Sequence, residues 1–284
     1  MSADPLNFNE WRKHTRTFPD KRVTSAILEI CCYGASIGYE RPRDSIGIYP
    51  NLSTAEDKEI VTTNIASELA DNRLKHYENH LFLPAYYRAS PLGLVYKSDG
   101  TKRRIHHLSY LPEEESSINR GIPEHYSTIA YSNISEAVSG IQSQGKNSLL
   151  IKRDFEKAFC HIPIFLLDSP LLGFHWQNKY YAKLYLPLGL RTALYIFNLF
   201  AQTFHWILET LLKSNGLPAV VVHYLDDFLI VLPEKHDLSQ YSDIFAGLCT
   251  YTQSIQISLN LTILTLETPA LMTLIGTNLD SVYQ

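Results

Sequence analysis

The stretch VVHYLDDFLIVL, from Val221 to Leu232, places two adjacent carboxylates between two apolar segments that both favour burial in a sheet. A β-hairpin satisfies this pattern, because both segments become strands while Asp226 and Asp227 lie at its tip. Two neighbouring carboxylates repel each other and are costly unless a positive charge neutralises them. The alternative is a solvated turn, since Asp is common in turns.

A second apolar segment also ends in a carboxylate, because LLIKRDF places Asp154 just before Phe155. If this strand lies beside the hairpin in one sheet, three carboxylates meet at one edge. Oxygen ligands of this kind suit Mg²⁺, and the set can hold two ions roughly 3.5–4 Å apart, as in in-line phosphoryl displacement. The sequence alone leaves open whether the strands are neighbours.

The remaining pattern mixes helices with strands. Residues 54–75 and 192–213 have helical periodicity, and hairpin turns are predicted at Asp99-Gly100 and around Asn178-Lys179. This mixture predicts an α+β fold with a mostly antiparallel sheet.

Composition limits the setting of the protein. The 284 residues are 45% hydrophobic, which allows a sizeable core, and the net charge of −4 restricts any nucleic-acid surface to a local patch. The four cysteines form no C-x-x-C pair, so neither a zinc site nor a disulfide framework is indicated. No apolar run of about 18 residues predicts a membrane span. We therefore expect an intracellular protein, in the cytoplasm or nucleus, with no membrane partner.

Five blocks occur in one order along the chain: SPLGLVYKSDGTKRRIHHLSY with SINRGIP, LLIKRDFEKAFCHIPI, LPLGLRTALYIFNLF, VVHYLDDFLIV and LIGTNLDS. Together they resemble reverse transcriptases of retroelements, and the full pattern is most similar to fungal DIRS-like or gypsy-type retrotransposons. The resemblance implies an α+β right-hand polymerase with fingers and palm, and an antiparallel palm sheet packed on helices. It also implies RNA-directed DNA polymerase activity, which adds deoxynucleotides to a primer on an RNA or DNA template.

The implied domains are a partly helical N-terminal region at residues 1–75, fingers at 76–147 and a palm at 148–284. A further fingers hairpin is expected near 165–190, and a hairpin that grips the primer end near 271–282. The latter is equally well read as a plain closing pair of strands. Because the sequence stops soon after it, a thumb is expected to be absent.

The resemblance also implies roles for individual residues. Asp154, Asp226 and Asp227 would be catalytic and bind two Mg²⁺ ions, for which Mn²⁺ could substitute, with the Phe155 carbonyl as a further ligand. The expected nucleotide-binding residues are Lys97, Arg103, Phe159, Leu188 and Gly189, and the expected template or primer contacts are Arg104, Arg191, Tyr224, Leu274, Ile275 and Gly276. Lys97 and Arg103 would clamp the triphosphate of the deoxynucleoside triphosphate, and Phe159 would exclude a 2′-hydroxyl.

Each role has a structural alternative. Phe159 is ordinary core if the motif is set aside. The strip Lys97–Arg104 carries four cations against one Asp, which leaves +3, and is also typical of a solvated hairpin face.

The chain departs from the family pattern at several positions. It has His107 where the family usually has Asp, Thr192-Ala193-Leu194 in place of Ser-Ala-Pro, and no lysine after Lys235 to protonate the leaving pyrophosphate. Two other hypotheses therefore stay open. One is a degenerate, inactive palm-like remnant that binds nucleic acid or a protein, and the other is a different palm-bearing metal enzyme such as a nucleotide cyclase. The oligomeric state is not predicted.

Overall fold

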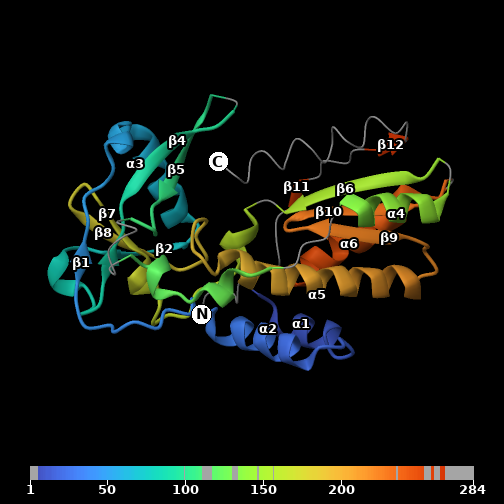
Figure 1. The fold of residues 1–284 in the computed structure, drawn as a ribbon, viewed down its shortest axis with the longest axis horizontal. Coiled ribbons are helices and arrows are strands. Elements are labelled where there is room, and N and C mark those ends of the chain that lie inside the picture. The colour runs from blue at the N-terminus through green and yellow to red at the C-terminus, as the bar shows by residue number, and fades with distance from the viewer. Residues whose placement is uncertain are drawn as a thin grey trace. The chain divides into compact units, whose positions relative to one another are not determined.

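The computed structural model describes residues 6–98, 100–110, 117–129, 134–145, 147–155, 157–234, 236–252, 257–258 and 263–265. The chain divides into two compact units (Figure 1). Unit 1 comprises Met1–Phe8, Ser25–Ile129 and Phe159–Phe197, and unit 2 comprises Asn9–Thr24, Ala130–Ala158 and Asn198–Gln284. The hairpin expected near 271–282, with Leu274, Ile275 and Gly276, lies outside the described residues.

Unit 1 contains a five-stranded sheet in the order β1-β3-β7-β8-β2. Its strands are β1 (Gly47–Ile48), β2 (Leu74–Tyr77), β3 (Arg88–Ala89), β7 (Gly173–Trp176) and β8 (Lys179–Lys183). β3 pairs in parallel with β1 and β7, and the other pairs are antiparallel. β7 and β8 form the hairpin predicted around residue 178, with its turn at Gln177 and Asn178, which both have positive φ.

A separate two-stranded hairpin pairs β4 (Leu92–Tyr96) with β5 (Lys102–His106), as the Asp99-Gly100 pair predicts. Helix α3 (Lys58–Ala70) begins four residues later than the predicted 54, because the Asp57 side chain caps it by accepting from the Ile60 N–H at 3.4 Å. The apolar residues shared by these elements form one core: Val61, Ile65, Leu92, Leu94, Phe174, Trp176 and Tyr181. This core joins α3, the β4–β5 hairpin and strands β7 and β8.

Unit 2 contains an antiparallel sheet in the order β11-β6-β10-β9, with β12 also paired to β6. Its strands are β6 (Leu149–Phe155), β9 (Val220–Tyr224), β10 (Asp227–Leu232), β11 (Ile257–Ser258) and β12 (Ile263–Thr265). The predicted neighbourhood of the Asp154 strand and the Val221–Leu232 hairpin is therefore confirmed. The hairpin turn is Leu225-Asp226, so Asp227 is the first residue of β10 and not part of the tip.

The helices that remain are α1 (Phe8–His14), α2 (Lys21–Tyr33), α4 (Ile134–Gln144), α5 (Ala193–Ser214) and α6 (Leu238–Thr252). In unit 2, α4 packs on one face of the sheet against Leu150 and Val231. On the other face, Phe155 of β6 contacts Phe204 of α5 and Phe245 of α6, with ring centroids 5.1 and 5.9 Å apart. Helices thus cover both faces of the sheet, and its strands are apolar on both sides.

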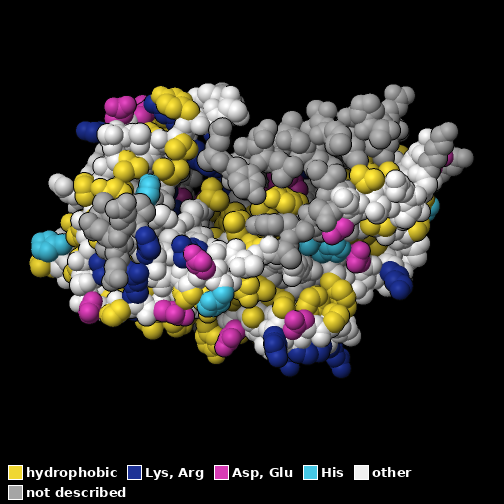
Figure 2. Space-filling view, viewed as in Figure 1, with side chains coloured by type: hydrophobic (Ala, Val, Ile, Leu, Met, Phe, Trp, Pro, Cys, Tyr) yellow, Lys and Arg dark blue, Asp and Glu magenta, His cyan; other side chains and the backbone are white. Residues whose placement is uncertain are grey.

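Short 3₁₀ turns connect several of these elements: Ser53–Glu56, His80–Phe82, Asn119–Gly121, Glu124–Ser127, Ala158–His161 and Ser169–Leu172. Within the described residues, no helix is both long and apolar enough to cross a membrane. On the face shown in Figure 2, Lys and Arg side chains are interspersed with Asp and Glu, as the net charge of −4 suggests.

Candidate active site

Backbone pairing brings three acidic residues to one end of the unit 2 sheet. Asp227 of β10 lies directly opposite Asp154 of β6 and opposite Tyr224 of β9. Asp226 occupies the turn between β9 and β10, where Leu225 takes a left-handed conformation with φ of 54°. The Phe155 N–H donates to the Asp226 carbonyl at 3.1 Å and so fastens this turn to β6.

Strand alternation decides which way these side chains face. Along β6, Asp154 shares a face with Lys152 and with Leu150, which packs against α4. Along β10, Asp227 shares that face with Val231, the residue opposite Leu150. The α4 contact therefore lies at the opposite end of the strands from Asp154 and Asp227.

Like charges dominate this end of the sheet. Burial, together with the charges of Asp154 and Asp227, raises the pKa of Asp226 to about 6 against the opposing effect of Lys152. The Lys152 ammonium lies 3.0 Å from Oδ1 of Asp227 and offsets part of the negative charge. Directly opposed like charges destabilise a sheet, so this arrangement favours a bound cation.

The donor chemistry fits a divalent metal. Carboxylates and main-chain carbonyls are the ligands that Mg²⁺ prefers, and this end of the sheet brings Asp154, Asp226 and Asp227 together beside the main chain of Phe155. Among the described residues, no three His, Cys, Asp or Glu side chains are already arranged as a ligand set. Coordination therefore requires Asp154, Asp226 and Asp227 to turn toward a common point.

The raised pKa of Asp226 predicts a pH-dependent stability in metal-free protein. Because its folded pKa of about 6 exceeds the ordinary 3.8, its contribution to stability is present below pH 4 and is lost as pH rises through 6. Asp226→Asn removes this loss, so the variant should be more stable than wild type at pH 8, by an amount on the order of 1 kcal/mol. Urea denaturation in EDTA at pH 5 and pH 8 measures it. A variant less stable than wild type at pH 8 would contradict the prediction.

The cationic strip Lys97–Arg104 of the β4–β5 hairpin divides between two faces. Arg103 pairs with Val95, and alternation places Lys97 on their side, whereas Lys102 and Arg104 face the other way. Lys97 and Arg103 are both exposed and remain available to a ligand.

The two inward-facing cations meet acidic residues of the α3 region. Lys102 lies 3.2 Å from Asp57, and Arg104 lies 2.7 Å from Glu68, with an Arg104 side chain that is only 7% exposed. The Arg104 guanidinium is held inside the unit by this ion pair, and its expected template contact stays a prediction. Asp57 and Glu68 are eleven residues apart, about three helical turns, which is the sequence signal that could have revealed them.

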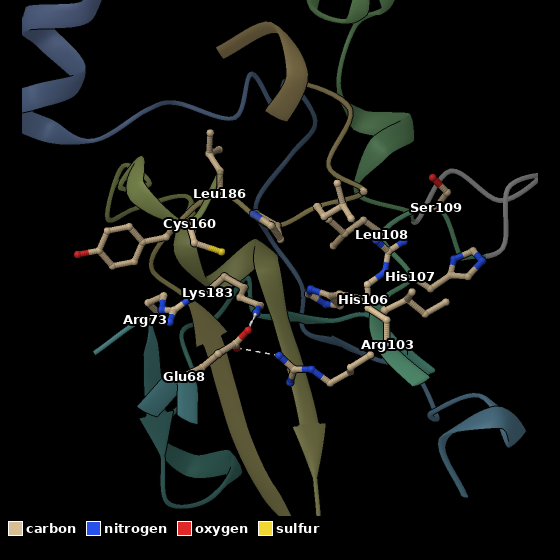
Figure 3. Close-up of a pocket in the computed structure, with 16 residues that line it drawn as sticks. Glu68, Arg73, Arg103, His106, His107, Leu108, Ser109, Cys160, Lys183 and Leu186 are labelled. Atoms are coloured by element: carbon tan, nitrogen blue, oxygen red, sulfur yellow. Dashed lines mark hydrogen bonds and ion pairs between the residues drawn. The ribbon is translucent and has the colours of Figure 1, made fainter. Parts of the chain in front are cut away.

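A pocket of about 450 Å³ in unit 1 contains several of the expected nucleotide-binding residues (Figure 3). Arg103, Leu188 and Gly189 line it together with His106 and Lys183. Leu188 is 52% exposed, and Gly189 has φ of +91°, a conformation that favours glycine.

Asn119 is a residue of this region that sequence reasoning missed. Its Nδ2 donates to Ser109 Oγ and to the Gly189 carbonyl, each at 2.8 Å, and its Oδ1 accepts from the Arg191 N–H at 2.8 Å. It is buried, so it fixes the LPLG loop from inside the unit. The sequence signal that could have found it is its place in the SINRGIP block.

The structure places the remaining candidates as follows. The Phe159 ring packs on Phe197, with centroids 5.3 Å apart, and is half-buried. Arg191 Nη1 donates to the Ile122 carbonyl at 2.8 Å, so part of its guanidinium stabilises the segment that contains Ile122. Tyr224 ends β9 and is half-buried. Phe159 and Arg191 belong to unit 1, whereas Tyr224 and the three carboxylates belong to unit 2.

Comparison with known proteins agrees with this geometry. A family model described as reverse transcriptase (RNA-dependent DNA polymerase) matches residues 99–260. No curated protein sequence matches the chain.

Similar solved structures include three foamy virus proteins. Native prototype foamy virus protease-reverse transcriptase is 22% identical, with a TM-score of 0.50, over 78% of this chain and 25% of its own. The CSH mutant of that protein is 19% identical, with a TM-score of 0.51, over 88% and 32%. The foamy viral protease-reverse transcriptase dRH in complex with double-stranded DNA is 14% identical, with a TM-score of 0.52, over 92% and 44%.

This chain therefore spans less than half the length of each of those proteins. Its mixed α+β fold matches their fingers and palm region.

Proposed function

Because the chain belongs to the reverse transcriptase family, whose model matches more than half of its residues, we propose that it acts as the RNA-directed DNA polymerase of a retroelement. It adds deoxynucleotides to a primer 3′ end along an RNA or DNA template. The observation that carries this proposal is the meeting of Asp154, Asp226 and Asp227 at one end of an antiparallel sheet. The order of its motif blocks further supports a retrotransposon origin.

The family uses divalent metal ions, and the three carboxylates with the Phe155 carbonyl are the groups that would hold them in this chain. Two such ions, if bound, would supply activation of the primer hydroxyl and neutralisation of charge on the leaving pyrophosphate. The chain's own residues bind and orient the substrates. Exposed Lys97 and Arg103 neutralise the triphosphate, and Gly189 lets the backbone approach the nucleotide closely.

We also propose that residues 76–147 act as fingers and that the palm begins at residue 148. The hairpin near 165–190 would be a further part of the fingers, inserted in the palm sequence. The grouping of residues 76–129 with the hairpin near 165–190 in unit 1 supports the joining of these two segments, whereas residues 130–147 group with the sheet of unit 2. The β4–β5 and β7–β8 hairpins lie together in that unit.

Template-primer extension tests the proposed function. Wild-type chain, an RNA template with a DNA primer, and deoxynucleoside triphosphates should give extended primer in Mg²⁺ or Mn²⁺ and none in EDTA. Folded protein that extends no primer with either metal would reject the activity.

The absence of lysine after residue 235 favours one alternative, an inactive remnant that still binds nucleic acid or a protein partner. It predicts no extension in any metal, while RNA binding persists in a filter or polarisation assay. Extension by purified wild type excludes it. Pyrophosphate release without a template would instead indicate a cyclase-like enzyme.

Phe159→Ala should weaken discrimination against ribonucleotides. The ring packs on Phe197 and supplies the bulk that excludes a 2′-hydroxyl, so its removal makes room for that group. We expect the ratio of deoxynucleotide to ribonucleotide kcat/KM to fall about tenfold or more. The exposed Phe82→Ala serves as the matched control and should leave the ratio unchanged. An unchanged ratio in Phe159→Ala would mean that Phe159 is an ordinary core residue that does not exclude the 2′-hydroxyl.

A further inference from the structure

Three charged side chains from separate elements of unit 1 meet at its pocket: Glu68 of α3, Arg104 of β5 and Lys183 of β8. Figure 3 shows Lys183 pointing toward Glu68. The Lys183 ammonium donates to both carboxylate oxygens of Glu68, at 2.8 and 2.7 Å, and Arg104 Nη2 lies 2.7 Å from Oε2. The side chains are 21%, 7% and 11% exposed, respectively. Since buried charges persist only when paired, Glu68 is what allows the two cations to lie together.

The neighbouring groups do not supply the negative charge that pairs with Arg104 and Lys183. Burial, together with the charge of Lys183, lowers the pKa of His106 to about 3, so its ring is neutral and hydrogen-bonds the Gly173 carbonyl at 3.0 Å. The Phe174 ring lies 5.2 Å from the Arg104 guanidinium carbon and 5.9 Å from the Lys183 ammonium, which favours cations there but supplies no acceptor. Arg104 Nη1 is buried without a hydrogen-bond partner among the described residues. The other terminal nitrogen of Arg104, Nη2, therefore depends on Glu68 for its ion pair.

Strand β5 depends on this contact more than a central strand would. It belongs to a two-stranded sheet, so β4 is its one paired neighbour in the described part of the chain. The other ion pair that ties β5 to the rest of unit 1, Lys102 with Asp57, is 27% and 32% exposed. Such half-exposed pairs contribute little, whereas the Glu68–Arg104 pair is shielded from water.

The position of Arg103 depends on the Glu68–Arg104 ion pair. Arg103 is the residue before Arg104 in β5, and its side chain faces the other side of the strand. A shift of β5 therefore moves Arg103 with it. Lys183 has a different place, because it neutralises Glu68 from β8 and, as a cation, repels Arg104 of β5 instead of pairing with it.

We propose that Glu68 is a positioning residue for the incoming nucleotide, because it holds β5 through Arg104 so that Arg103 presents its guanidinium to the triphosphate. The inference rests on the proposed function, in which Arg103 binds that triphosphate. Lys183 stabilises the same network without setting the position of β5. Loss of Glu68 and loss of Lys183 should thus affect nucleotide binding differently.

The experiment compares three variants of the full chain with wild type. Dissociation constants for a deoxynucleoside triphosphate are measured by calorimetry in Mg²⁺, with an RNA template and a primer that ends in a dideoxynucleotide, so that no reaction occurs. Glu68→Gln and Arg104→Met should raise Kd about tenfold or more, because both release β5. Lys183→Met keeps the Glu68–Arg104 pair and should stay within about threefold of wild type.

Thermal unfolding is measured in parallel, because all three changes break a buried network and should lower Tm. Equal rises in Kd for Glu68→Gln and Lys183→Met would indicate a general loosening of unit 1 and would overturn the proposal. An unchanged Kd in Glu68→Gln would also overturn it, as would the absence of nucleotide binding by wild type. If Glu68→Gln fails to fold, the Kd values of Arg104→Met and Lys183→Met are compared instead, and equal rises would again overturn the proposal. Selective loss of binding in a protein that extends no primer would uphold the positioning role while rejecting the polymerase activity.

Discussion

Asp226→Asn is expected to lower primer extension by about 10³-fold or more, the scale of several kcal/mol of metal-based charge stabilisation. The change keeps the size of the side chain but removes one of three carboxylates at the end of the sheet. Asp154 and Asp227 already act on Asp226, since both raise its pKa. The amide cannot supply the negative charge that two divalent ions require. Single-turnover extension in Mg²⁺ measures the effect.

Asp243→Asn is the matched control, because it makes the same chemical change at an exposed position of α6 in the same unit. We expect it to extend primer at the wild-type rate. Loss of activity in Asp226→Asn cannot be ascribed to unfolding if its stability at pH 8 equals or exceeds that of wild type. Extension by Asp226→Asn within tenfold of wild type would reject the carboxylate mechanism.

Phe228→Ala is expected to destabilise the protein by about 3–5 kcal/mol. Phe228 is fully buried, with its ring centroid 5.0 Å from that of Phe155, 5.3 Å from Phe204 and 5.9 Å from Phe245. On its own hairpin, the ring stacks on His223 at 5.2 Å. Truncation leaves a cavity between β6, β10, α5 and α6 that such a rigid aromatic cluster cannot close.

Urea denaturation followed by circular dichroism gives the free energy of unfolding, with the m-value as a check on two-state behaviour. Phe82→Ala makes the same substitution at a side chain that is 65% exposed, and should change stability by less than about 0.5 kcal/mol. Similar losses in both variants would mean that the aromatic cluster is not the main support of the unit 2 sheet.

The carboxylate site could be predicted from sequence because its information is local. Apolar runs on both sides of Asp226 and Asp227 define a hairpin, and a third run ending at Asp154 suggests a neighbouring strand. Register was not predictable in the same way. The direct opposition of Asp154 and Asp227 depends on pairing between strands more than seventy residues apart in sequence, which no local pattern encodes.

The residues of the β4–β5 hairpin show where local information fails. The strip Lys97–Arg104 looks uniformly cationic in sequence, but alternation turns Arg104 inward, and its partner Glu68 lies in a preceding helix. Asn119 was missed for the same reason, because its partners Gly189 and Arg191 are about seventy residues further along the chain. An isolated Glu or Asn carries no signal that it will be buried, since burial is decided by the packing of remote segments.

The tie between the Phe155 amide and the Asp226 carbonyl makes stability and chemistry depend on a single choice of register. If β10 slipped by one residue against β6, its side chains would exchange faces, and Phe228 would point toward α4 while Asp227 entered the aromatic cluster. Both the core and the carboxylate edge would be lost together. Selection for a folded protein therefore also preserves the spatial order of the acidic groups.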